Sequence, residues 1–515
     1  MVCSLLFIVW YFILCTGGID LTFGRYDDGS YPLFRSLKGV HSEDFHNACF
    51  KVTEESGPRQ PWHDIHSQVH GPVVLDLLQN FEERWLGQGG LAKELTDIRK
   101  AGLSATAKDL QGSPECWSTQ LFRSIDNRTA KLHTKEMKPI HFDKIEGVKF
   151  DNEGKQQKAG KKRERLMQKL LHTGKEYQRS FAGNNMEGFV FTRNLHSKRD
   201  IHIDNSVQRG LIHHIRNAQH CLYIETQYFL GSAFLWEEHQ TQRCCNLIPA
   251  EITWKICEKI EAGERFVAYI VVPMWPEGLP DAMSVQDILF YQYQTMQSMY
   301  IRIDAALKRR KELLTKAGQK DELSDVKPSD YLNFYCLVNR ETNKGGEDDI
   351  SIKYPLNRTR RHLVYCHSKM TIVDDSVAMI GTANMNQRSL DGNRDSELIL
   401  ASWQPSHLAS HDSVAKGEVH AFRLHCFAHL TGVMEDVFRD PSSLECVRRV
   451  NDIAEKTWKL YCQDEVCDLK SHLAPYPIQV MEGGKVVART ANGKFPDTNA
   501  NILGSKPTLP SYLTT

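Results

Sequence analysis

The sequence predicts an α/β fold in which helices flank a mostly parallel sheet. From residue 206 onward, short apolar runs alternate with longer segments whose apolar residues recur every three or four positions, as strands and helices do in such folds. The run F-V-A-Y-I-V-V at 266–272 is apolar throughout, which is typical of a strand with both faces covered. Crossovers between parallel strands are right-handed, and ligand sites lie where the strands end. We therefore expect functional loops at 273–280 and 340–361.

Length and composition indicate an ordinary globular protein. The 515 residues leave room for two or more domains, with 41% hydrophobic and 25% charged residues. Lys+Arg and Asp+Glu are equal at 64 each, so the overall charge favours neither nucleic acid nor an anionic membrane. The 14 cysteines show no metal-ligand spacing, which predicts a reducing compartment and no disulfide framework.

The N-terminal third begins with an apolar leader at 1–16. This leader is too short for a confident membrane span and lacks the basic start of a typical secretory signal, so a buried strand and a signal peptide at 1–15 both remain open. A strand at 17–27 should run into glycine-punctuated turns, and a further strand is expected at 117–126. Between them, Gly71-Pro72 opens a helix with one apolar stripe, formed by Val74, Leu77, Leu78, Phe81 and Trp85.

The segment 131–200 differs in character from its surroundings. Its stretch 155–179 is strongly basic and permits a helix. Such a stretch can bind anionic lipid head groups. A solvated, loop-rich insertion explains the same composition, and we favour that interpretation.

The elements after residue 200 follow from their periodicity. A helix capped by Ser206 carries Val207, Leu211 and Ile215 on one side, and a strand follows at 221–229. A second helix ends near Gly263, as helices with a C-terminal glycine do. After the strand 266–272, a long helix at 284–314 and a strand at 332–338 complete the alternation.

The stretch 362–389 carries the chemistry. Its β-branched residues predict a buried strand pair with a tight turn at 374–376. Within it stand His367 and Lys369, and residues two apart in a strand point to the same face. A buried lysine needs a partner, and the simplest partner for an imidazole beside an ammonium is a phosphate. The alternative is a half-buried strand that carries the two residues by chance.

The residues His367, Lys369, Asp374, Gly381 and Asn384 form the pattern H-x-K-x4-D followed by G-T-x-N. This pattern resembles the signature of the phospholipase D superfamily. Further blocks are similar to plant-type phospholipase D in the same order. They are G-G-I-D-L, W-H-D-I-H, Y-I-E-T-Q-Y-F-L-G-S, V-V-P-M-W-P-E-G-L-P, N-Q-R-S-L-D-G-N-R-D-S-E and F-P-D-T-N-A-N-I-L-G.

The resemblance implies a phospholipase D fold, which is pseudo-duplicated with one H-x-K-x4-D motif in each half. This sequence carries only the second motif and no N-terminal lipid-binding β-sandwich, so we expect the first half to be truncated. The expected divisions are a remnant of the first half at 17–130, the insertion at 131–200, the second catalytic half at 201–460 and a segment at 461–515 that packs on the catalytic domain.

The resemblance also implies hydrolysis of phosphatidylcholine or a similar lipid to phosphatidic acid and a free alcohol through a phosphohistidine. His367 would be the nucleophile or the general acid. Lys369, Asn384 and Gln227 would bind the phosphate oxygens, and Asp374 would orient the site. Two further residues, Arg388 and Glu397, would be buried partners of these groups.

The family has a calcium site in its catalytic region. His63, within W-H-D-I-H, matches one of its ligands, whereas Tyr31 and Ala428 stand where two other ligands are expected. Calcium prefers several oxygen ligands, so a functional site is doubtful in this chain. The expected partner is a phospholipid at a membrane surface, with the protein in the cytoplasm and peripheral to the membrane. The oligomeric state stays open, and no nucleic acid is expected.

Two alternatives remain beside the hydrolase. One is a catalytically impaired protein that binds phospholipid or phosphatidic acid through the same phosphate pocket. The other is a single-motif phosphodiesterase that completes its site as a homodimer. The persistence of 17–126, which would occupy the docking face, and the neutral net charge count against the homodimer.

Overall fold

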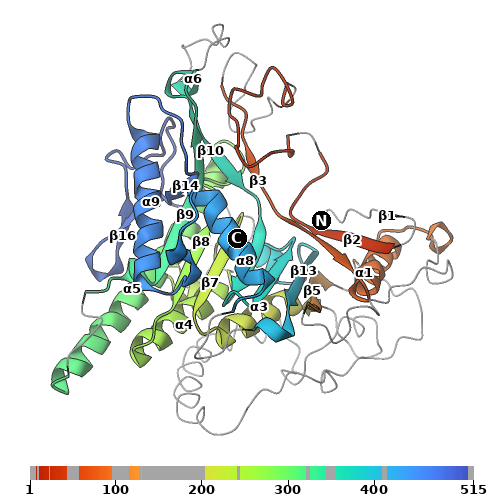
Figure 1. Cartoon of the computed structure of the whole chain (residues 1–515), viewed down its shortest axis with the longest axis horizontal. Coiled ribbons are helices and arrows are strands. Elements are labelled where there is room, and N and C mark those ends of the chain that lie inside the picture. Colours follow the sequence, from red (N-terminus) through yellow and green to blue (C-terminus); the bar gives the residue numbers. More distant parts are fainter. Residues whose placement is uncertain are drawn as a thin grey trace.

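The computed structural model describes residues 7–8, 11–22, 24–42, 44, 57–95, 115–126, 129, 203–239, 244–319, 325–343, 355–408 and 415–507 (Figure 1). Its centre is an eleven-stranded sheet. In spatial order the strands are β3 (Trp62–His63), β10 (Arg361–Cys366), β9 (Leu332–Arg340), β8 (Val267–Val271), β7 (Cys221–Thr226), β11 (Lys369–Val373), β12 (Val377–Gly381), β13 (Glu397–Trp403), β5 (Ser118–Asp126) and β6 (Ile203–Asn205), with β14 (Leu473–Pro475) also paired to β9.

The sheet is mixed, so the prediction of a mostly parallel sheet is wrong. Strands β7, β8 and β9 are parallel, as is the pair β3–β10. The remaining pairs of this sheet are antiparallel. The physical reason is connection length, because β11 and β12 are joined by a tight turn that only antiparallel neighbours allow. The strand–helix alternation at 206–338 corresponds only to the parallel strands β7, β8 and β9 at the centre of the sheet.

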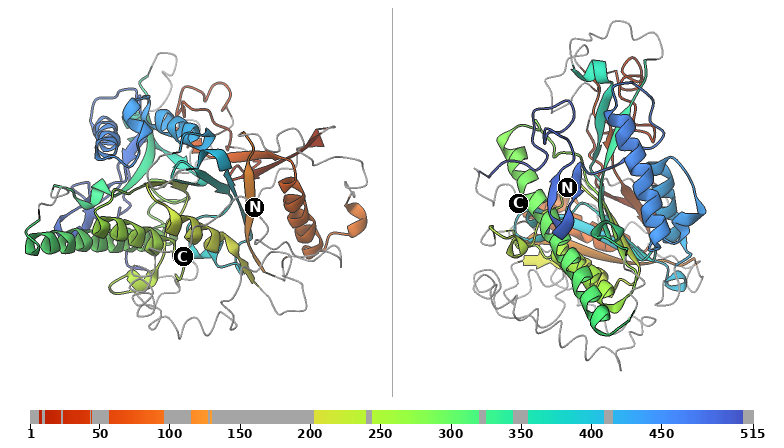
Figure 2. Two further views of the ribbon diagram at one scale, coloured as in Figure 1. Left: turned by 60° about the horizontal axis from the view of Figure 1, so that its bottom comes forward. Right: turned by 90° about the vertical axis from the view of Figure 1, so that its left-hand side faces the viewer.

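Helices cover both faces of the sheet, as predicted (Figure 2). One face carries α3 (Ser206–Asn217), α4 (Ile248–Ala262) and α5 (Met283–Lys316), and the other carries α8 (Glu418–Thr431) and α9 (Leu444–Cys462). Alternate residues of β7 enter the two cores, with Leu222 in the first and Tyr223 in the second. The helix α4 ends where Gly263 takes a positive φ of 78°.

The helices α8 and α9 were not predicted. The apolar residues of α8 are spread around the helix rather than gathered in one stripe, which removes the periodic signal. The expected cap at Ser206 is also wrong, since its hydroxyl accepts from the main-chain N of Arg123 at 2.9 Å instead. Short helices are α6 (Pro355–Thr359), α7 (Gln387–Leu390), η1 (Ala92–Glu94), η5 (Ala233–Leu235), η6 (Pro328–Asp330), η7 (Pro405–His407), η8 (Asp436–Arg439) and η9 (Glu482–Gly484).

The N-terminal segment forms its own small sheet. Its strands are β1 (Phe7–Ile8), β2 (Tyr11–Gly17) and β4 (His66–His70), and α1 (Val73–Gly87) packs beside them against Leu398 and Leu400. The predicted strand at 17–27 is therefore wrong in position, because β2 ends at Gly17. At Gly18 the backbone passes so close to Asp64 that a Cβ would lie 2.1 Å from its Oδ1.

The C-terminal segment lies along the first face, where β15 (Ile478–Val480) pairs with β16 (Val486–Ala488) and Phe495 is buried. The predicted insertion at 131–200 lies outside the described residues, as does 344–354 of the predicted charged loop. The division of the chain at residues 130, 200 and 460 stays a prediction. None of the helices in the described ranges combines the length and apolar character needed to span a bilayer.

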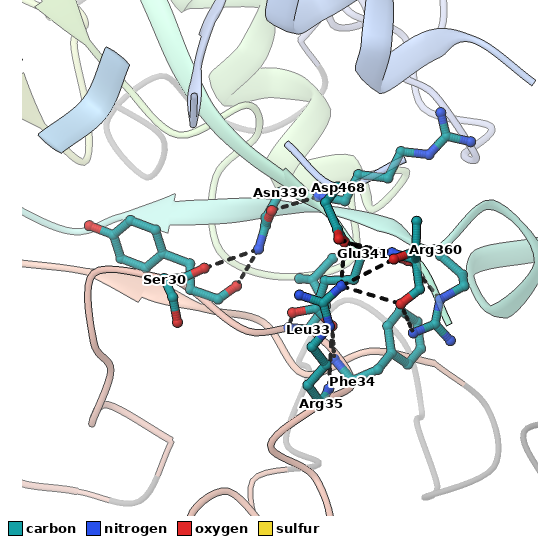
Figure 3. A network of polar contacts seen from close by, with 11 residues as sticks. Ser30, Leu33, Phe34, Arg35, Asn339, Glu341, Arg360 and Asp468 are labelled. Carbon is teal, nitrogen blue, oxygen red and sulfur yellow. Dashed lines mark hydrogen bonds and ion pairs between the residues drawn. The ribbon is translucent and has the colours of Figure 1, made fainter. Parts of the chain in front are cut away.

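A polar network fastens the segment around Tyr31 to the end of β9 (Figure 3). The buried Glu341 carboxylate accepts the main-chain N–H groups of Leu33 at 2.9 Å, Phe34 at 3.0 Å and Arg35 at 3.3 Å. The Asn339 amide donates to the main-chain oxygen of Tyr31 at 2.7 Å. Tyr31 is thereby fixed next to β3, close to the predicted site.

Candidate active site

His367 lies in a break between two strands. β10 ends at Cys366 and β11 begins at Lys369, so the predicted strand is interrupted at His367 and Ser368. The main-chain N of His367 donates to the main-chain oxygen of His63 at 2.7 Å, which continues the pairing with β3. The ammonium of Lys369 donates to the main-chain oxygen of His367. The Lys369 ammonium therefore lies against the His367 backbone, although the two residues do not share one continuous strand.

The His367 imidazole is held by a carboxylate and two aromatic rings. Its Nδ1 lies 2.7 Å from Oδ2 of Asp64, and its ring centroid lies 4.9 Å from that of Trp62 and 6.3 Å from that of Tyr365. A carboxylate only accepts hydrogen bonds, so Nδ1 carries the proton and Nε2 keeps its lone pair. Burial and the nearby charge of Lys369 lower the pKa of His367 against the opposing effect of Asp64, so the ring is neutral at pH 7.

Three buried polar side chains converge beside His367. The Gln227 Oε1 accepts from the Lys369 ammonium at 3.0 Å and from the Asn384 amide at 3.2 Å, and its Nε2 donates to the Tyr365 hydroxyl at 3.0 Å. Burial lowers the pKa of Lys369 to about 8, while Asp64 and Glu397 oppose the shift. Lys369 therefore remains mostly charged at pH 7. The structure thus brings together His367, Lys369, Gln227 and Asn384.

The Glu397 carboxylate supports the turn that presents Asn384. It accepts from the Thr382 hydroxyl at 2.5 Å and from the Ser389 hydroxyl at 2.8 Å, and burial raises its pKa to about 7. Arg388 differs from its prediction as a buried partner. Its side chain is 51% exposed and pairs with Asp395 at 3.0 Å, because the short helix α7 points this position toward solvent.

Asp374 does not join these groups. It lies at the far end of β11 from Lys369, five residues along a strand, which corresponds to roughly 16 Å. Its carboxylate accepts the main-chain N–H groups of Gln219 at 2.6 Å, His220 at 2.7 Å and Cys221 at 2.9 Å. An orienting role for Asp374 would therefore be indirect, and it stays a prediction. Asp374 fastens the β11–β12 turn to the start of β7.

The residues around His63 do not fit a calcium ion. Its Nε2 lies 2.8 Å from the Glu225 carboxylate and its Nδ1 is hydrogen-bonded to the Tyr31 hydroxyl, so both ring nitrogens are occupied. The same hydroxyl lies 2.8 Å from Nε2 of His429, and Ala428 beside it offers no ligand. Across the described ranges, no three His, Cys, Asp or Glu side chains are grouped so that they could hold a metal ion.

Asp64 is a residue of the candidate site that the sequence motifs did not identify. The block W-H-D-I-H was singled out for its histidine, whereas the aspartate between the two histidines makes the contact with His367. The two residues are 303 positions apart, and no local pattern reports such a pairing. The sequence did offer one signal, since Asp64 is a carboxylate within the block W-H-D-I-H that carries the family resemblance.

A family model described as phospholipase D matches residues 11–152 and 151–504. The chain is 39% identical to phospholipase D alpha 2 of Oryza sativa subsp. japonica over 517 residues, which cover 97% of this chain and 56% of that protein. It is 37% identical to phospholipase D beta 1 of Arabidopsis thaliana over 525 residues, which cover 98% of this chain and 43% of that protein. The chain therefore spans about half the length of these relatives.

Among solved structures, the phospholipase D family member Nuc from Salmonella typhimurium is 12% identical, with 39% of this chain and 77% of that chain covered. The TM-score of 0.18 is too low for this likeness to bear on the fold.

Proposed function

Since the chain belongs to the phospholipase D family, we propose that it hydrolyses the distal phosphodiester bond of phosphatidylcholine or a similar glycerophospholipid, releasing phosphatidic acid and a free alcohol. The observation that carries this proposal is the pairing of a neutral His367 with Asp64 next to the buried Lys369. An attacking imidazole, a carboxylate that orients it and a cation for the phosphate are the parts that such a reaction needs.

The proposed first step forms a bond between Nε2 of His367 and phosphorus while the bond from phosphorus to the alcohol oxygen breaks. Asp64 holds the Nδ1 proton, so it keeps the reactive tautomer and stabilises the positive charge that the imidazole gains. In the second step water attacks phosphorus, the P–N bond breaks, and the proton that water loses passes to Nε2 of His367 as phosphatidic acid leaves. His367 then returns this proton to solvent, which offsets the proton that the alkoxide takes up in the first step. Two easier displacements thus replace one difficult displacement.

The phosphate oxygens gain negative charge in both steps, and Lys369 and Asn384 are the donors that face it. Of the three N–H groups on the Lys369 ammonium, Gln227 and the main-chain oxygen of His367 accept two, which leaves the third for a substrate oxygen. Gln227 keeps both donors aligned before the substrate arrives. Donors that need no rearrangement stabilise a charged transition state most effectively.

The departing alkoxide needs a proton from a second acid. In the part of the chain that the structure describes, no second imidazole contacts His367, since His63 is bonded to Glu225 and Tyr31 instead. This observation favours a second candidate function. In that case the protein binds phospholipid or phosphatidic acid in its phosphate pocket and hydrolyses the lipid slowly or not at all.

One experiment separates the two functions. The purified chain is assayed for choline release from phosphatidylcholine vesicles and for hydrolysis of a chromogenic phosphodiester, with His367→Ala and the exposed control His425→Ala. The hydrolase predicts turnover that His367→Ala abolishes and His425→Ala preserves. Absence of His367-dependent turnover, together with sedimentation of the chain with phosphatidic-acid vesicles, would establish the binding function instead.

A further inference from the structure

Two buried N–H donors at the Trp62 ring, against which His367 packs, have no hydrogen-bond acceptor. They are Nε of Arg25 and Nε1 of Trp62, and neither forms a hydrogen bond with any described residue. Most buried donors in folded proteins find a partner, so two neighbouring exceptions require an explanation. Arg25 comes from the G-G-I-D-L-T-F-G-R-Y-D stretch and Trp62 from β3, so different elements bring the two donors together.

Both donors belong to a cluster around the Trp62 ring, which His367 also contacts. The guanidinium carbon of Arg25 is 3.9 Å from the centroid of the Trp62 ring. The same ring lies 4.9 Å from the ring of His367. Arg25 and His367 are therefore both within 5 Å of one indole centroid. The Arg25 side chain is only 18% exposed, so its charge lies at the edge of the site rather than in solvent.

The neighbouring carboxylates hold Arg25 without accepting its hydrogens. Asp20 lies 3.7 Å from Nε and Glu277 lies 3.6 Å from Nη2, which are ionic contacts beyond hydrogen-bond length. Both carboxylates are partly exposed, at 38% and 43%. Arg59, from the same part of the chain, shows the contrasting case. Its guanidinium donates to Asp44 at 2.7 Å and to Asp27 at 2.8 Å.

We propose that Arg25 and the indole N–H of Trp62 bind an anionic oxygen of the substrate lipid beside His367. A guanidinium whose face packs on an aromatic ring keeps its N–H edge for an oxyanion, and such charge-assisted bonds are strong. We assign the oxygen to the phosphodiester, because the Trp62 ring contacts both Arg25 and His367, the group proposed to attack phosphorus. A carboxylate on the lipid head group has the same chemistry and is tested separately. The proposal rests on the proposed function, in that it assigns the same site a further substrate contact.

Three variants test the two donors. Arg25→Gln removes the charge of the guanidinium, whereas Arg25→Lys keeps a charge but removes the planar fork of N–H groups. Trp62→Phe removes the indole N–H but keeps an aromatic ring. We expect Arg25→Gln to raise KM for dihexanoyl phosphatidylcholine by about tenfold to a hundredfold, as for one lost hydrogen bond to a charged group, with kcat nearly unchanged. The other two variants should shift KM in the same direction by less. Arg35→Gln is the matched control, since Arg35 pairs with Asp468 and is expected to leave KM unchanged.

The outcomes distinguish a binding role from a structural one. A rise in KM for dihexanoyl phosphatidylserine, with none for phosphatidylcholine, supports the anion site and assigns it to the head-group carboxylate. An unchanged KM for both lipids, or a lower melting temperature with reduced kcat alone, overturns the proposal.

Calorimetric titration with dihexanoyl phosphatidic acid supplies a readout that does not need turnover. If the wild-type chain is inactive but binds, and Arg25→Gln weakens binding, the hydrolase fails and the anion site stands. If the wild-type chain does not bind, the anion site fails.

Discussion

The reactivity of His367 depends on two neighbours of opposite charge. Asp64 fixes the tautomer through Nδ1, and Lys369 disfavours a second proton on the ring. The imidazole is therefore both oriented and neutral before substrate binds. Neither condition follows from the spacing of the H-x-K motif alone, because Asp64 reaches the site from a distant part of the chain.

Replacing Asp64 by Asn should lower turnover by about a hundredfold to ten-thousandfold, the range that proton transfer and tautomer control contribute in enzymes. An amide at this position can offer its N–H to Nδ1, which would place the proton on Nε2 and remove the attacking lone pair. Steady-state kinetics on a chromogenic phosphodiester measures the effect, and Asp436→Asn on the surface is the control. Turnover within threefold of wild type in Asp64→Asn would show that the carboxylate does not control His367.

The dependence of kcat/KM on pH should have two limbs. Activity needs His367 neutral, and its pKa is lowered by burial, so the acid limb should lie below pH 6.5. Activity also needs Lys369 charged, and burial lowers its pKa to about 8, so activity should fall as the pH rises through 8. Lys369→Arg should move the alkaline limb beyond the measured range, because a guanidinium keeps its proton. An alkaline limb that stays in place in Lys369→Arg would assign it to another group.

At the scale of elements, the β11–β12 hairpin is joined to two other parts of the fold through the adjacent residues Asp374 and Asp375. Asp374 binds the main-chain N–H groups before β7, whereas the buried Asp375 accepts from Arg423 at 2.7 Å and 2.9 Å and contacts His420 at 2.7 Å. Both residues adopt positive φ, of 52° and 54°, which turns the chain within two residues. The aspartate of H-x-K-x4-D thus fastens the hairpin to the start of β7, and its neighbour Asp375 fastens the hairpin to α8.

Asp375→Asn should destabilise the fold by about 3–5 kcal/mol, because it leaves the fully buried Arg423 without its counter-charge. Urea unfolding followed by far-UV circular dichroism measures the loss, and the exposed Asp436→Asn should change the free energy of unfolding by less than about 0.5 kcal/mol. The folded fraction should keep the wild-type KM, since Asp375 lies in the turn at the far end of β11. A free energy of unfolding equal to that of wild type would mean that the network is not stabilising.

At the scale of the whole molecule, the sequence predicts the parts that local periodicity encodes. The helices that became α3, α4 and α5 and the strands that became β7, β8 and β9 follow from apolar spacing and from Gly263. The mixed pairing does not, because periodicity marks strands without giving their direction. The groups that we propose bind phosphate were identified from the motif and from the blocks that carry Gln227 and Asn384. Asp64 and Arg25 were missed, because their contacts with His367 and Trp62 come from separate segments that no local pattern connects.

Glu341 has a consequence for the order in which this molecule folds. Its bonds to residues 33–35 span 306 to 308 positions, and the bond from Asp64 to His367 spans 303. Contacts that close such long loops form slowly, so the centre of the sheet should form before the N-terminal segment docks. Pulse-labelling hydrogen exchange during refolding should protect amides of β7, β8 and β9 before those of residues 33–35, and Glu341→Gln should widen the delay. Simultaneous protection would contradict this order. His367 and Asp64 therefore come from segments that meet last, and a newly made chain should form its compact core before it completes the proposed active site.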